Sequence, residues 1–205
     1  MISQEALNDN LASLAAEHEE VAAALERAGM PLRRHTPPGF PTLLNAIVGQ
    51  QISVKAAAAI RGRLYAALAD PTPECLLNLS WQDLRDAGLS ARKIDYAQGL
   101  ARAMIEGRVC LTTLKGLDDE AATAHLTQLK GFGPWSAKIY LLFSEGRGDI
   151  YPPADLALEK GLQLMLGLPE KPVTKEAESL VLKYSPYRSA LCHLLWALYG
   201  AATLD

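Results

Sequence analysis

Asp155 is the carboxylate in this sequence whose neighbours best suit chemistry. It follows Tyr151-Pro152-Pro153-Ala154 and begins an apolar segment of helical spacing that runs to residue 166. The two prolines hold the approach extended, so the aspartate stands at the start of a helix. An aspartate at this position is commonly an N-cap that accepts backbone N–H groups. The alternative is a carboxylate aimed into a cleft and held there by the same N–H groups.

A second candidate is the segment 129–138, Leu-Lys-Gly-Phe-Gly-Pro-Trp-Ser-Ala-Lys, which joins two stretches of helical periodicity. Gly131 and Gly133 can adopt positive φ and have no Cβ, so another molecule can approach their backbone closely. Pro134 suits the first position of a helix, and the N–H groups of a helix start attract anions. The pattern predicts a phosphate clamp, and the alternative is a plain turn between two helices.

Helical spacing of apolar residues covers nearly the whole chain, and we find no convincing strand alternation. Ser3, Ser53, Ser80 and Ser90 stand where N-caps are expected. The basic residues of 91–110, Lys93 among them, are expected to form a solvated face. The expected helices are 4–28, 40–50, 54–68, 81–87, 91–106, 119–129, 134–144, 155–166, 175–184 and 186–199. The sequence therefore predicts an all-α protein.

Composition excludes several classes of protein. The chain has 205 residues, of which 49% are hydrophobic and 21% charged, so it is not intrinsically disordered. Net charge is −3, with −5 in the first 30 residues and +2 in the rest, which argues against DNA binding by bulk electrostatics. Three scattered cysteines (Cys75, Cys110, Cys192) argue against a disulfide framework or a Cys-rich metal site. With no signal peptide or membrane span in the sequence, we expect an intracellular protein, cytoplasmic if bacterial.

Four motifs together resemble the helix–hairpin–helix DNA glycosylases. They are the hairpin 129–137, Pro-Ala-Asp at 153–155, Ile-Val-Gly-Gln-Gln-Ile-Ser at 47–53 and Pro-Tyr-Arg-Ser at 186–189. The similarity runs from about residue 40 to residue 196 and is greatest to the alkylation-repair branch, the 3-methyladenine-DNA glycosylase II type. Longer bacterial members carry an N-terminal β domain, whereas here a helical pattern precedes residue 40. The resemblance therefore implies a compact form without that domain.

The resemblance implies a role for several residues. Asp155 matches the catalytic aspartate, which stabilises an oxocarbenium-like state at C1′. Trp135 stands where the bifunctional glycosylase/lyases carry a nucleophilic lysine, so strand cleavage is not expected. Trp135 and Trp196 match aromatic residues that line the base pocket, and the alternative for both is a place in the core.

The resemblance also implies which residues meet DNA. Gln51 matches the residue that fills the gap left by a flipped nucleotide, and the alternative is that Gln50 and Gln51 both only cap and bridge helix ends. A structural alkali cation can be held by the carbonyls of Thr127, Leu129 and Phe132, while the spacing of the histidines predicts no catalytic metal. The DNA-binding residues expected are Gln51, Gly131, Phe132, Gly133, Trp135 and Ser136.

The predicted architecture is one glycosylase domain, 1–205, made of two helical lobes with an active-site cleft between them. One lobe spans about 37–145 and includes the helix–hairpin–helix at 119–144, and the other combines 1–36 with 146–205. The predicted function is monofunctional excision of alkylated purines from double-stranded DNA, by a monomer that needs no cofactor and no membrane. The alternatives are a glycosylase for another damaged base, a non-catalytic damage-binding module, and a helical interaction protein whose acidic first helix binds a partner.

Overall fold

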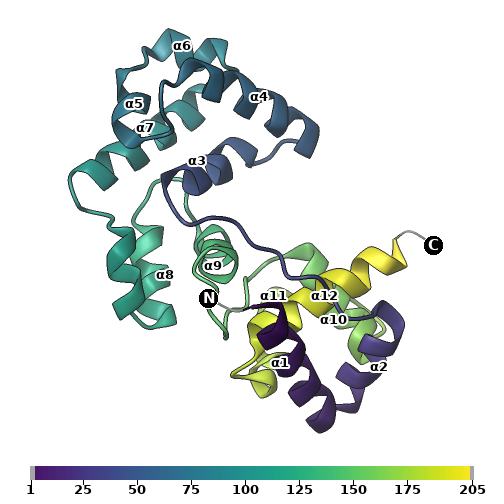
Figure 1. Ribbon diagram of the computed structural model, residues 1–205. Helices are drawn as coiled ribbons and strands as arrows, with labels where there is room; N and C mark the ends of the chain where they lie inside the picture. Colours follow the sequence, from purple (N-terminus) through teal and green to yellow (C-terminus); the bar gives the residue numbers. More distant parts are fainter. Residues whose placement is uncertain (1–2, 204–205) are drawn as a thin grey trace. The chain divides into compact units, whose positions relative to one another are not determined.

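The computed structural model describes residues 3–203, and every regular element in that stretch is a helix (Figure 1). The prediction of an all-α protein is confirmed. None of the helices between residues 3 and 203 combines the length and the apolar character that crossing a membrane requires.

The chain divides into two compact units, which are described separately. One unit combines the segment up to Thr36 with the segment from Leu141 onward, and the other unit is Pro37–Tyr140. The sequence pattern places the end of this second unit at about residue 145, whereas in the structure it ends at Tyr140. The reason is that Phe143 packs in the first unit, with its ring centroid 5.2 Å from that of Trp196.

The 37–140 unit is organised around α7 (Ala91–Ile105), a helix whose Ile94, Ala97 and Leu100 are buried. It contacts α3, α5 and α6. The other helices of this unit are α3 (Phe40–Gly49), α4 (Val54–Ala67), α5 (Pro73–Asn78), α6 (Trp81–Asp86), η1 (Leu111–Gly116), α8 (Asp119–Thr127) and most of α9 (Pro134–Phe143). Helices α8 and α9 flank the predicted hairpin.

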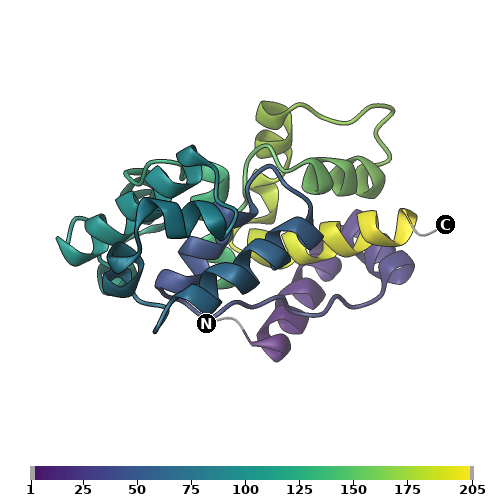
Figure 2. The ribbon, with the colours of Figure 1, turned by 90° about the horizontal axis from the view of Figure 1, so that it is seen from above.

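The other unit is built on α12 (Arg188–Ala202), which is buried almost continuously from Ser189 to Trp196. Figures 1 and 2 show this helix packed along α10 and α2. The remaining helices here are α1 (Gln4–Glu17), α2 (Glu19–Ala28), α10 (Leu156–Leu166), α11 (Thr174–Leu180) and η2 (Leu182–Tyr184). Gly161 of α10 allows the close approach, because a Cβ there would lie 2.9 Å from the Leu195 carbonyl carbon of α12.

Glu20 fastens α2 to η2. Its Oε1 accepts hydrogen bonds from the buried Tyr184 hydroxyl at 2.7 Å and from Lys183 Nζ at 2.6 Å. Burial alone would raise the pKa of Glu20, but these two hydrogen bonds outweigh it and lower the pKa to about 2. The carboxylate is therefore ionised over the whole physiological range.

Several element boundaries differ from the predicted ones. The stretch 4–28 is two helices, because His18 adopts an extended conformation (φ −133°, ψ 104°) between them. The predicted helix 175–184 ends as α11 and continues as η2. Helix α5 was not predicted, although Thr72 caps it and Pro73 opens it. The four predicted serine caps are confirmed, each accepting a backbone N–H from three residues ahead.

Candidate functional site

Asp155 is held by two donors from separate elements of its unit. It is the N-cap of α10, and its Oδ1 accepts the Leu158 backbone N–H at 3.0 Å. The same oxygen accepts the indole N–H of Trp196 at 3.3 Å, from a helix 41 residues further along the chain. The residue is half-buried. These contacts fix the orientation of a carboxylate that solvent still reaches, which is what electrostatic stabilisation of a developing cation requires.

The loop that leads to Asp155 is anchored to the start of α12. The Arg188 guanidinium donates to both oxygens of Asp149, from Nε and Nη2, each at 2.8 Å. Ser189 Oγ accepts the Ile150 N–H at 2.9 Å. Ala154, just before the aspartate, has a φ of +55°. Non-glycine residues in this region store strain, which surrounding structure must support.

Trp196 lies in the core of its unit and also reaches the candidate catalytic group. Its side chain is only 8% exposed and packs against the rings of Phe143 and His193. Burial lowers the pKa of His193, so its imidazole is neutral at pH 7. The guanidinium carbon of Arg34 lies 5.4 Å from the Trp196 ring centroid. The structure therefore brings Trp196 and Asp155 together. It also places the Arg34 guanidinium on the Trp196 ring, a contact that the sequence pattern does not reveal.

The predicted hairpin is present in the 37–140 unit, between α8 and α9. Phe132 N–H donates to the Leu129 carbonyl at 3.0 Å and closes the turn. Gly131 has a φ of +85°, and a Cβ there would lie 2.7 Å from Cε2 of the Tyr96 ring. Gly133 is exposed but does not adopt positive φ, so that prediction was wrong. The reason is Pro134, which forces the preceding residue toward extended backbone.

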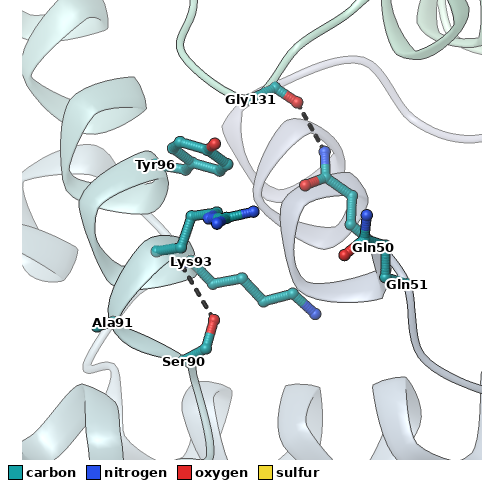
Figure 3. Close-up of a pocket in the computed structure, with 8 residues that line it drawn as sticks. Gln50, Gln51, Ser90, Ala91, Lys93, Tyr96 and Gly131 are labelled. Atoms are coloured by element: carbon teal, nitrogen blue, oxygen red, sulfur yellow. Dashed lines mark hydrogen bonds between the residues drawn. The ribbon is translucent and has the colours of Figure 1, made fainter.

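The two glutamines after α3 are used differently. Gln50 donates its side-chain N–H to the Gly131 carbonyl at 2.8 Å, which ties this turn to the hairpin (Figure 3). Gln51 is exposed and has a φ of +56°, a strained conformation for a non-glycine residue. Strain of this kind is concentrated at functional positions.

Lys93 is not part of a solvated face, contrary to the expectation for 91–110. Its Nζ donates to the Val48 carbonyl at 2.7 Å, and burial lowers its pKa. It lines a hollow of about 490 Å³, together with Tyr96, Gln50 and Gly131 (Figure 3). The lysine thus closes the C-terminal end of α3 and supports the turn that carries Gln51.

A second hollow, of about 540 Å³, gathers three of the predicted site residues. Trp135 and Ser136 of α9 line it together with Gln51. Trp135 is 43% exposed, which makes an aromatic ring available at the surface. Phe132 differs, because the residue is only 4% exposed and lies in the core.

The predicted cation site rests on backbone carbonyls. Thr127 is the last residue of α8, and the Leu129 carbonyl already accepts the Phe132 N–H. A carbonyl oxygen has two lone pairs, so this hydrogen bond leaves room for a cation, and the site stays a prediction. Between residues 3 and 203, no group of three His, Cys, Asp or Glu side chains is placed to hold a metal ion.

Sequence reasoning did not single out three residues that shape these sites: Arg34, Tyr96 and Lys93. Their contacts span from 35 to 162 positions of the chain, so no local pattern records them. Gln50 lies inside the quoted motif 47–53, and its contact with Gly131 agrees with the alternative that the glutamines form a bridge.

Comparison with known proteins places the whole arrangement in one family. The model of the HhH-GPD superfamily base excision DNA repair proteins matches residues 44–186. DNA-3-methyladenine glycosylase 1 of Schizosaccharomyces pombe is 34% identical over 165 residues, which are 77% of this chain and 71% of that protein.

Two solved structures share the fold. DNA-3-methyladenine glycosidase from Bacillus halodurans superimposes with a TM-score of 0.85 at 30% identity, over 96% of this chain and 91% of its own. The S. pombe 3-methyladenine DNA glycosylase Mag1, in complex with abasic DNA, gives a TM-score of 0.81 at 28% identity, over 92% and 95%. The chain therefore belongs to the HhH-GPD superfamily of base excision DNA repair proteins.

Proposed function

We propose that this protein is a monofunctional DNA glycosylase that excises alkylated purines, of the 3-methyladenine and 7-methylguanine type, from double-stranded DNA. The observation that carries the proposal is the fixed carboxylate of Asp155, held by Leu158 N–H and by the Trp196 indole N–H. The names of the relatives, which are 3-methyladenine glycosylases, support the substrate class.

The chemistry needs little more than one anion. Alkylation at N3 or N7 gives the purine a positive charge, so the base is a good leaving group. When the C1′–N bond breaks, its electron pair goes to the base, and positive charge develops on the sugar. The Asp155 carboxylate stabilises that charge and orients the water that attacks C1′, and the proton released by the water passes to solvent. Because the carboxylate is already oriented by its two donors, little reorganisation is needed as the charge develops.

The same proposal assigns the recognition of DNA to the 37–140 unit. The backbone of Gly131, Phe132 and Gly133 would bind phosphate, and Gln51 would fill the stack after the nucleotide flips. Trp135 and Ser136 line the hollow beside Gln51. Trp135 and Trp196 would offer aromatic faces to the base. We expect the protein to act as a monomer and without an added cofactor.

Replacing Gly133 by alanine is expected to raise the Kd for an abasic-site duplex about tenfold, a loss of about 1.4 kcal/mol. A Cβ at this position meets no atom within 4 Å, so the variant should fold normally while it obstructs an approaching phosphate. Gly62→Ala is the matched control, since it also points into open space, on α4. Fluorescence anisotropy measures the affinity. An unchanged Kd would show that the hairpin is only a turn. Gly131→Ala is unsuitable because its Cβ would collide with Tyr96.

Product analysis tests the proposed reaction. On a duplex with one alkylated purine, the protein should release the base and leave the abasic strand intact until alkali or heat is applied. Trp135 cannot form a Schiff base, so borohydride should trap no covalent adduct. A glycosylase/lyase run in parallel provides the positive control. A trapped protein–DNA adduct would contradict the monofunctional assignment.

A further inference from the structure

Arg34 introduces a charge beside the proposed base site. It lies in the extended segment after α2 and is itself exposed. Its guanidinium carbon is 5.4 Å from the centroid of the Trp196 ring, and that indole donates to Asp155 Oδ1 at 3.3 Å. One side chain thus covers the aromatic ring that contacts the candidate catalytic carboxylate.

The charge of Arg34 is not neutralised by a carboxylate. In the part of the chain that the structure describes, 3–203, Arg34 forms no ion pair. A guanidinium keeps its proton at any pH at which the protein is folded. Trp196 is 8% exposed, and the guanidinium lies over its ring.

This arrangement affects cationic and neutral bases in opposite directions. An uncovered indole face attracts a cationic purine, but here a cation already occupies the ring. The guanidinium repels a second positive charge on the same ring, because water screens two charges only in part when they lie close together. A neutral purine is not repelled, because the planar guanidinium can stack on it and can donate hydrogen bonds to its oxygen or ring nitrogen.

The leaving step preserves the difference. A cationic base receives the electron pair of the C1′–N bond and leaves neutral. Arg34 therefore repels the base less as the bond breaks, but still repels it in the transition state. A neutral base receives the same pair and leaves with negative charge, which the guanidinium stabilises until water supplies a proton. Arg34 keeps its own proton in both cases.

We propose that Arg34 selects lesions by charge, and that it shifts the enzyme toward damaged purines that are neutral in DNA, such as deaminated purines, relative to cationic alkylated ones. This inference rests on the proposed function, which it deepens by naming the residue that sets the substrate range. Arg34 acts on the base and not on the sugar cation, so its effect differs from that of Asp155.

The test compares excision from two duplexes, one with 7-methylguanine as the cationic base and one with hypoxanthine as the neutral base. Single-turnover rates at subsaturating protein give a second-order constant for each. For Arg34→Met, the ratio of the 7-methylguanine constant to the hypoxanthine constant should rise about tenfold. Arg34→Lys keeps the charge and should hold the ratio within about threefold of the wild type.

The 7-methylguanine data should also divide in a particular way. Repulsion is stronger in the bound ground state than in the transition state, so Arg34→Met should tighten binding of this duplex and slow excision from the bound complex, while the second-order constant still rises. Arg85→Met is the matched control, because Arg85 lies 5.5 Å from the Trp81 ring centroid in the 37–140 unit. It removes the same kind of contact and should leave the ratio unchanged.

Two results would overturn the inference. If Arg34→Met changes both constants by the same factor, Arg34 only supports Trp196, and the proposed function stands without the selector. If the wild-type protein releases neither base, the proposed function fails and the inference fails with it. Thermal melts of each variant confirm that the proteins compared are folded.

Discussion

Asp155→Asn is expected to lower single-turnover excision of 3-methyladenine by a few hundredfold or more while the protein still folds and binds damaged DNA. The amide keeps the size of the side chain and an oxygen that can accept the Leu158 and Trp196 N–H groups. It removes the negative charge that stabilises the developing cation, and this loss raises the activation free energy by about 3–4 kcal/mol. 7-Methylguanine should be affected less, because more of its driving force comes from the leaving group itself.

Asp118→Asn is the matched control for this experiment. Asp118 caps α8 through Oδ1, which accepts the Ala121 N–H at 2.7 Å, and it has no proposed part in catalysis. Both variants should lose little stability as caps, and only Asp155→Asn should lose activity. If a well-folded Asp155→Asn excises bases at nearly the wild-type rate, Asp155 is a helix cap alone. The catalytic group would then have to be another residue.

Gly161→Ala is expected to lower the free energy of unfolding by about 2–3 kcal/mol. The new Cβ would lie 2.9 Å from the Leu195 carbonyl carbon and closer still to its oxygen. These are backbone atoms inside α12, so they cannot move away as a flexible side chain would. The overpacking therefore destabilises the folded protein. The higher helix propensity of alanine offsets only about 1 kcal/mol.

Thermal unfolding measures this effect, with a fall in Tm of about 5–10 °C expected for a chain of this length. Gly99→Ala is the control, because Gly99 lies inside α7 and a Cβ there meets nothing within 4 Å. That variant should be as stable as the wild type or slightly more stable. A Gly161→Ala protein with an unchanged Tm would show that α10 and α12 are not in such close contact.

The elements most readily predicted from the sequence are those fixed by neighbours in the chain. Serine caps depend on an N–H three residues ahead, so Ser53 and Ser90 could be read directly. The break at His18 could not be read, because apolar spacing continues through it. For Gly133, the predicted positive φ was wrong although the decisive residue, Pro134, is adjacent.

The candidate site shows the same limit at longer range. The turn before Asp155 was predictable from its prolines and the helix that follows. Its bond to Trp196 was not, since that contact depends on how α10 and α12 pack. Lys93 was read as solvated because a basic run on a helix usually is, whereas α3 presents a carbonyl to it. The support of the site thus comes from packing, which residue types alone do not specify.

The central claim is that this protein hydrolyses the bond between alkylated purines and DNA, and direct measurement of released bases tests it. Wild-type protein is incubated with methylated duplex DNA, and the freed bases are separated and identified by mass spectrometry. We expect free 3-methyladenine and 7-methylguanine that increase with time and protein, at rates well above spontaneous loss. No release above the protein-free control, from protein shown to be folded, would contradict it.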